Sequence, residues 1–172
     1  MRQLVIEPAS GEDVTAYLRM RDEAAEQMVA RGIVQWRPGE LTEDALRRWA
    51  VDGEIFAARL DGTLVGGLFV MWSDPVFWGD RDDKAGYTHG LLVDRRLKGE
   101  GLGRRLLAFA EEHIRDSGRA LSRLDTVTTN AVLRGYYRAA GYREVGERTF
   151  EGGKVLAHGA PIGAVTLFEK SL

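Results

Sequence analysis

The stretch from residue 86 to residue 117 places the strongest constraint on the fold of this 172-residue chain. Residues 86–93 read GYTHGLLV, and such a run of aromatic, β-branched and apolar residues predicts a strand. Residues 102–117 predict an amphipathic helix, because apolar residues recur every four positions along one face: Leu102, Leu106, Ala110 and Ile114. A basic, glycine-rich turn joins the two. A strand that feeds directly into a helix is typical of a fold in which helices cover a sheet.

Apolar periodicity and turn residues predict the other elements, and the full order is β-α-α-β-β-β-α-β-α-β-β. Ser10 and Thr42 are expected to cap the first two helices, and Asp61-Gly62 predicts a tight hairpin turn. The last helix is expected to run from a cap at Asn130 to about Ala140. The other predicted strands are 3–7, 54–60, 64–72, 121–128, 142–150 and 164–170, the last two joined by a glycine-rich connection. This order predicts an α/β (α+β) fold, a mixed sheet with helices on both faces, in a single domain over residues 1–172.

The composition excludes several classes of protein. The chain has 24 basic and 26 acidic residues, and a formal charge of −2 argues against a nucleic-acid-binding protein. It has no cysteine, which excludes disulfides, thiol nucleophiles and thiolate metal sites. No stretch approaches ~18 consecutive apolar residues, and the N-terminal residues lack the pattern of a signal peptide. We therefore expect a soluble, cytoplasmic protein with no membrane contact.

The turn between the strand at 86–93 and the following helix predicts an anion site. It reads Lys98-Gly99-Glu100-Gly101-Leu102-Gly103. Glycines at a helix N-terminus present backbone N–H groups and the positive end of the helix dipole to one point, where a phosphate binds well. The G-x-G-x-G spacing fits neither the Walker pattern nor the dinucleotide fingerprint. The alternative is an ordinary glycine-rich turn that caps the helix.

Two segments together resemble the GNAT superfamily of acyl-CoA-dependent N-acetyltransferases. Residues 93–103 are similar to the family's acyl-CoA-binding signature, although Lys98 stands where Gln or Arg is usual. Asn130, Tyr136-Tyr137 and Gly141-Tyr142 are similar to a second family segment, about thirty residues further on. The resemblance implies a GNAT-like, mostly antiparallel central sheet. It also implies an acyltransferase that moves an acetyl group from acetyl-CoA to a primary amine. The amine is expected on a small molecule rather than a peptide.

The same resemblance implies which residues bind the co-substrate. The expected acetyl-CoA-binding residues are Leu91, Leu92, Val93, Lys98, Gly99, Glu100, Gly101, Leu102, Gly103, Arg104 and Asn130. Because the chain has no cysteine, direct transfer is expected rather than an acyl-enzyme intermediate. A non-catalytic acyl-CoA-binding sensor or interaction module is the alternative function. The fold is compatible with a homodimer.

Tyr137 and His89 are the expected catalytic residues. Tyr137 matches the family's tyrosine that faces the thioester sulfur, and a phenol with a pKa near ~10 can protonate a leaving thiolate. His89 is the candidate base, since an imidazole titrates near ~6.5; an ordered water is the other candidate. Strand alternation is expected to place His89 on the same face as Tyr87, Leu91 and Val93. The alternatives are an aromatic core stripe for Tyr137 and a hydrogen-bonded strand histidine for His89.

Aromatic residues and aspartates suggest where the acceptor binds. The expected substrate-binding residues are Trp36, Trp72, Trp78 and Tyr87. Aromatic walls near the aspartates at 74, 80, 82 and 83 would suit a cationic, partly apolar amine, whereas a solvated acidic loop is the alternative for the aspartates. The three histidines, His89, His113 and His158, are scattered, so no metal is expected.

Overall fold

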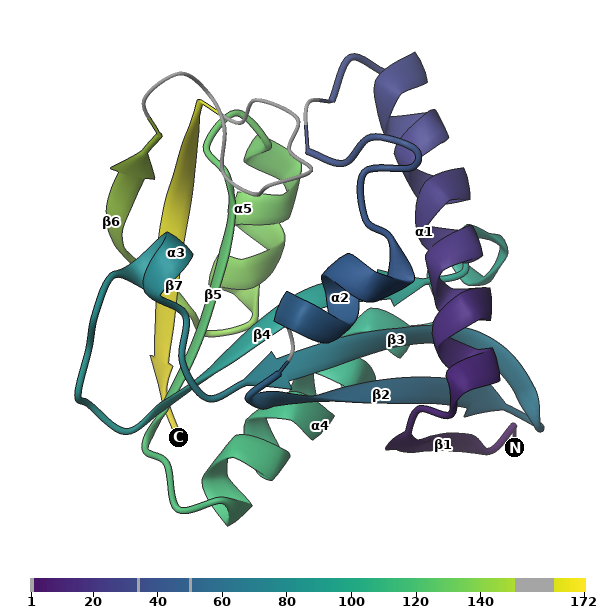
Figure 1. Ribbon diagram of the computed structural model, residues 1–172, viewed down its shortest axis with the longest axis horizontal. Coiled ribbons are helices and arrows are strands. Elements are labelled where there is room, and N and C mark those ends of the chain that lie inside the picture. The colour runs from purple at the N-terminus through teal and green to yellow at the C-terminus, as the bar shows by residue number, and fades with distance from the viewer. Residues whose placement is uncertain (1, 34, 50, 151–162) are drawn as a thin grey trace.

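One sheet of seven strands runs through the described part of the chain, which comprises residues 2–33, 35–49, 51–150 and 163–172 of the computed structural model (Figure 1). The strands are β1 (Leu4–Pro8), β2 (Gly53–Leu60), β3 (Thr63–Met71), β4 (Ala85–Val93), β5 (Leu121–Val127), β6 (Arg143–Thr149) and β7 (Ala164–Ser171). They follow the order β1-β2-β3-β4-β5-β7-β6, and every neighbouring pair is antiparallel except β4 and β5. The predicted mixed, mostly antiparallel sheet is confirmed.

Helices cover both faces of this sheet. They are α1 (Gly11–Ala30), α2 (Glu43–Trp49), the short α3 (Pro75–Trp78), α4 (Leu102–Asp116) and α5 (Ala131–Ala139). One hydrophobic cluster joins α1, α2 and α3 to the sheet, and two others join α4 and α5 to it; Figure 1 shows α1 and α2 in front of the strands and α4 behind them. The predicted order is confirmed, with α3 as an addition. The predicted glycine-rich connection at 151–162 lies outside the described residues.

Short-range polar contacts form where the sequence predicted them. The Ser10 hydroxyl accepts a hydrogen bond from the Asp13 N–H, and the Asp13 carboxylate accepts one from the Ser10 N–H. Asn130 Oδ1 accepts from the Leu133 N–H at the start of α5. Asp61 and Gly62 both have positive φ, at 51° and 82°, which is the backbone geometry of a tight hairpin turn. These caps and this turn fix the boundaries of the elements that carry the site.

Gly90 interrupts the alternation of β4. Its φ is +60°, its carbonyl accepts a hydrogen bond from the Tyr17 hydroxyl, and a Cβ at this position would lie 2.1 Å from the Phe69 ring. Before Gly90, His89 stacks against Phe69 on the α1 face of the sheet. After it, Leu91 and Val93 pack against the α4 cluster on the opposite face. The expectation that all four odd-numbered side chains share one face is therefore wrong beyond Gly90.

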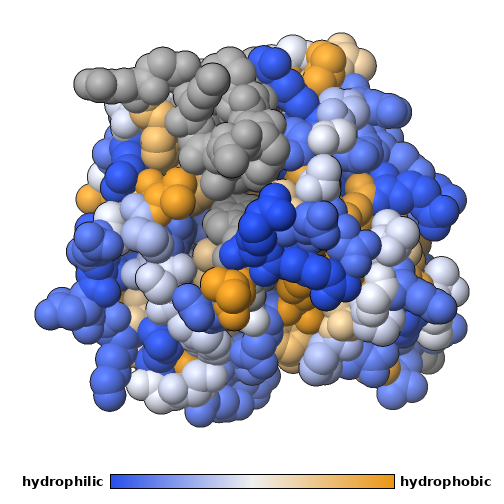
Figure 2. Space-filling view, viewed as in Figure 1, coloured by the Kyte–Doolittle hydropathy of each residue, from blue (hydrophilic) through white to orange (hydrophobic). Residues whose placement is uncertain are grey.

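The surface seen in Figure 2 is largely polar, with small and separate apolar areas. Among the described residues, no helix has the length and apolar character that crossing a membrane requires.

Candidate active site

A cavity of about 320 Å³ opens where β4 and β5 part. The two parallel strands pair only from Ala85 to Tyr87 on β4 and from Leu121 to Arg123 on β5. Further along, residues 88–93 and 125–127 line the cavity instead of bonding to each other. Residues of α1, the connection between α1 and α2, and α5 also line it, together with Phe69 of β3, Phe77 of α3 and Val165 of β7. The separation of two strands at the centre of the sheet thus makes room for ligands.

His89 lies in the wall of this cavity between two carboxylates. Its side chain is buried, and its Nε2 is 2.8 Å from Oδ2 of Asp74, the residue that caps α3. Its Nδ1 is 3.9 Å from Oδ2 of Asp125 on β5. Rings of Phe69 and Phe77 pack against the imidazole, with centroid distances of 6.0 and 5.6 Å. His89 is therefore held in one orientation, beside two carboxylates that lie close to each other.

Burial and these contacts shift the pKa values of His89 and Asp125. Burial by itself lowers the pKa of His89, but the charges of Asp74 and Asp125 and the hydrogen bond to Asp74 outweigh it, so the pKa lies above its usual 6.5. Burial raises the pKa of Asp125 to about 7; the Asp74 charge acts in the same direction and His89 opposes it. Asp125 Oδ2 is buried and has no hydrogen-bond partner within the described part of the chain. Asp125 is thus a carboxyl that titrates near neutral pH and has a free lone pair.

Sequence reasoning missed the roles of Asp74 and Asp125. The sequence leaves two interpretations of Asp74, part of an acceptor site or of a solvated acidic loop, and only 2% of its surface is exposed. The available signal for Asp125 was an acidic residue inside an otherwise buried strand, since charged groups are rarely buried without a partner. The three ligand atoms of Asp74, His89 and Asp125 lie within 4.8 Å of one another, an arrangement that also suits a divalent cation. His158, the third scattered histidine, lies outside the described residues.

Tyr137 of α5 lines the same cavity as His89 and Asp125. Burial raises the pKa of its phenol, and the neighbouring charge of Asp125 raises it further, so the hydroxyl stays protonated. The ring also packs against Tyr142 and Phe168, with centroid distances of 6.2 and 5.6 Å. Tyr137 therefore combines the two interpretations that the sequence left open: its ring belongs to the core, and the residue forms part of the cavity wall.

A second cavity, of about 440 Å³, lies over the glycine turn before α4. Gly99 and Gly101 have φ values of +93° and +73°, which favour glycine, and nothing described stands within 4 Å of a Cβ built at either. The wall also contains Lys98, Gly103, Leu102, Arg104 and Tyr136. The Tyr136 hydroxyl is buried and has no hydrogen-bond partner among the described residues. Open backbone, the three cations Arg95, Lys98 and Arg104, and a hydroxyl without a described partner are the groups that an anionic ligand needs.

Glu100 adds a negative charge to this turn, but its side chain is engaged elsewhere. Its carboxylate accepts hydrogen bonds of 2.7 Å from Arg2 at the start of the chain. Glu100 is not among the residues that line the second cavity. The Arg104 side chain contacts the end of α5, where its Nη2 donates a hydrogen bond to the Ala139 carbonyl. Of the expected co-substrate residues in this turn, Glu100 is thus the one whose side chain is directed away.

The remaining expected co-substrate residues lie on β4 and at the start of α5. Leu91, Leu92 and Val93 line the first cavity, and Val93 also lines the second, so the two cavities adjoin. Asn130 caps α5 with its Oδ1, and its Nδ2 donates to Gln35 Oε1 at 2.8 Å. Asn130 lines neither cavity. Its contact with Gln35 fastens the α1–α2 connection over the end of β5.

The expected substrate residues divide into two groups. Trp36 lines the first cavity, and the Arg21 guanidinium lies over its ring at 4.6 Å. Trp72, Trp78 and Tyr87 do not line it. Trp72 packs on the α4 face of the sheet, while Trp78 and Tyr87 surround the buried Arg123. Arg123 in turn donates a hydrogen bond from Nη1 to Asp83, one of the aspartates that the sequence places near the acceptor.

The fold and the site define the class of protein. A glycine turn at a helix N-terminus adjoins a cavity that holds a buried carboxylate, a histidine and a tyrosine, which fits a group-transfer enzyme with a phosphate-bearing co-substrate. Residues 17–142 match the model of the acetyltransferase (GNAT) family. The chain belongs to this family, and the protein is an acyltransferase enzyme that transfers acetyl groups.

Known proteins of similar sequence and structure agree with this assignment. The chain is 31% identical over 148 residues to the uncharacterized N-acetyltransferase YesJ of Bacillus subtilis, and the match covers 81% of each. A GNAT family acetyltransferase from Listeria monocytogenes has a TM-score of 0.74 at 21% identity, over 98% of this chain and 95% of that one. Another, from Elizabethkingia anophelis with acetyl-CoA bound, has a TM-score of 0.68 at 12% identity, over 98% of each chain. The two solved structures share the fold.

Proposed function

We propose that this protein transfers an acetyl group from acetyl-CoA directly to a primary amine of a small molecule. One observation carries the proposal: a proton acceptor, Asp125, and a proton donor, Tyr137, line one cavity, which adjoins the glycine turn through Val93. Acetyl transfer to an amine needs both, because the attacking amine must lose a proton and the departing thiolate must gain one.

The second cavity fits the phosphates of acetyl-CoA. Lys98 and Arg104 supply positive charge, the backbone of Gly99 and Gly101 is open, and the Tyr136 hydroxyl lacks a partner among the described residues. The Elizabethkingia relative, which has acetyl-CoA bound, shares the fold and so supports this choice of co-substrate. When bound, acetyl-CoA supplies the activated thioester carbonyl. Val93 and its neighbours on β4 would then orient the thioester toward the first cavity.

Asp125 is the proton acceptor in this proposal, and His89 positions and tunes it. The charges of Asp74 and Asp125 raise the pKa of His89, which favours the protonated ring, and a protonated imidazole cannot accept the proton of the amine. Asp125, with a pKa of about 7 and a free Oδ2, can accept it. The His89 imidazolium lies beside Asp125 and favours the carboxylate form. Asp74 holds the ring by the hydrogen bond to Nε2.

Isothermal titration with acetyl-CoA tests the function. We expect saturable binding to the wild type and weaker binding to Lys98→Ala, which removes a cation from the glycine turn. A surface variant on α5, Val132→Ala, is the control, because Val132 is 86% exposed and lines neither cavity. Absence of binding at millimolar acetyl-CoA would refute the proposal. Binding without release of thiol across a broad panel of amines would support a non-catalytic sensor instead.

Replacing His89 with Gln is expected to move the acidic limb of the kcat/KM profile upward from about pH 7. The imidazolium lowers the pKa of Asp125, so its loss raises that pKa and the carboxylate forms only at higher pH. At pH 7 the activity therefore falls, while at high pH much of it returns. A pH–rate profile from pH 5 to 9 measures this. If the limb disappears instead of moving, His89 itself is the base.

A further inference from the structure

Resting on the proposed function, we propose that the acceptor is a small amine that also carries a carboxylate, such as a free amino acid. Counting only partners among the described residues, the wall of the first cavity has two groups of opposite charge that each keep a buried polar atom without a hydrogen bond. One is the Asp125 carboxylate, and the other is the Arg21 guanidinium. An amine alone would engage only the first of them.

Arg21 of α1 is oriented so that it can bind an anion. Only 6% of the residue is exposed, its Nη2 donates to Glu40, and its guanidinium is stacked on the Trp36 ring. Its Nη1 is buried and has no hydrogen-bond partner within the described residues. Glu40 and Trp36 thus fix the plane of the guanidinium, while Nη1 has no partner in the described part of the chain. Nη1 carries two N–H donors, and charged donors of this kind suit a carboxylate.

The rest of the cavity fits the body of such an acceptor. The wall of the same cavity also contains the apolar side chains of Trp36, Leu41 and Phe77. A cavity of about 320 Å³ that must also admit the thioester leaves room for a molecule the size of an amino acid. The ammonium group of the acceptor would face Asp125, and its carboxylate would face Arg21. Each end then satisfies a group that otherwise stays unpaired.

Paired acceptors test the carboxylate preference. We would measure kcat/KM by thiol release, at saturating acetyl-CoA, for amino acids and for the amines that lack only their carboxylate, such as leucine and 3-methylbutylamine, or phenylalanine and 2-phenylethylamine. The better amino acids are expected to exceed their amines roughly 10- to 100-fold, the range for leaving a buried charged donor unpaired. For the carboxylate preference to hold, kcat/KM for at least one amino acid must exceed that for its matching amine by this factor.

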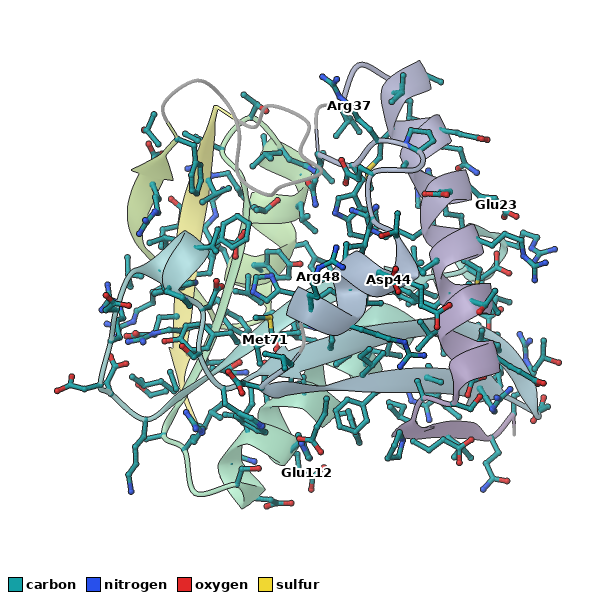
Figure 3. The ribbon with its side chains drawn as sticks, viewed as in Figure 1. Glu23, Arg37, Asp44, Arg48, Met71 and Glu112 are labelled. Carbon is teal, nitrogen blue, oxygen red and sulfur yellow. The ribbon has the colours of Figure 1, made fainter. Side chains whose placement is uncertain are left out.

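Arg21→Lys is the diagnostic variant. Lysine can keep the ion pair with Glu40, but its single ammonium group does not offer a second pair of donors in the fork geometry. The ratio between each amino acid and its amine should therefore fall to within about threefold. Arg37→Lys is the matched control, because Arg37 is an exposed arginine of the α1–α2 connection and projects outward (Figure 3). This control should keep the wild-type ratio.

The outcomes separate this proposal from the proposed function. Wild-type protein that binds acetyl-CoA and acetylates the amines as well as the amino acids overturns the carboxylate preference and leaves acetyl transfer intact. Binding of acetyl-CoA with no acceptor of either kind acetylated also overturns the preference. Failure to bind acetyl-CoA refutes the proposed function itself. Because wild-type selectivity is measured first, the test does not depend on whether Arg21→Lys folds.

Discussion

Replacing Asp125 with Asn is expected to lower kcat/KM at pH 7 roughly 10²- to 10⁴-fold, the usual contribution of a positioned base. Asparagine keeps the shape of the side chain but cannot take a proton from the amine. The acidic limb near pH 7 should disappear, because the group that titrates there, with a pKa of about 7, is gone. Acetyl-CoA affinity should change little, since Asp125 lines the first cavity and not the second.

A pH–rate profile of the Asp125→Asn variant, with titration calorimetry for acetyl-CoA, checks this result. Glu112→Gln is the matched control, because Glu112 is an exposed carboxylate that projects from α4 away from the cavity (Figure 3). Each assay should be run with and without a chelator, since Asp74, His89 and Asp125 could together hold a cation. A chelator removes a metal-dependent rate but not simple proton transfer. Retention of the acidic limb in Asp125→Asn would exclude Asp125 as the base.

The fold was predictable because local chemistry determines most of its boundaries. Ser10 and Asn130 cap helices through hydrogen bonds that reach only three residues along the chain. The Asp61-Gly62 turn sets the pairing of β2 with β3 in the same local way. Gly90 shows the limit of this reasoning. Its positive φ depends on contacts with Tyr17 and Phe69, and no local pattern could reveal them.

Part of the site was predictable from the sequence. The glycine turn follows from its own chemistry and Tyr137 from the resemblance to the GNAT family, and both line the cavities, as do the predicted His89 and Trp36. Asp125 became significant only when the partial pairing of β4 and β5 placed it beside His89, 36 positions earlier in the sequence. Residues that are close in the sequence can also pack in different places. Trp72 and Trp78, both expected to bind the acceptor, belong to different hydrophobic clusters. The orientation of the Arg21 guanidinium likewise depends on Glu40 and Trp36, which lie in the connection between α1 and α2.

Replacing Tyr137 with Phe is expected to lower kcat about 10²-fold while the affinity for acetyl-CoA stays within about twofold. This loss lies at the low end of the range for a general acid, because a thiol with a pKa near ~8.5 is a leaving group that departs with little help. Burial raises the pKa of the phenol, so Tyr137 remains protonated across the assay range and its loss should not move the acidic limb. Stopped-flow thiol release and calorimetry measure the two quantities.

Tyr142→Phe is the matched control for Tyr137→Phe. Tyr142 is a buried tyrosine that touches the Tyr137 ring, but its hydroxyl bonds to Ser122 at 2.7 Å and it lines neither cavity. Its removal leaves the fully buried Ser122 hydroxyl without this partner, so it should cost roughly 1–3 kcal/mol of stability and leave kcat nearly unchanged. Both variants lose one buried hydroxyl. A large fall in kcat for Tyr137→Phe but not for Tyr142→Phe therefore identifies the Tyr137 hydroxyl as the general acid. If Tyr137→Phe keeps kcat within twofold of the wild type, Tyr137 is a core residue and the thiolate leaves without its proton.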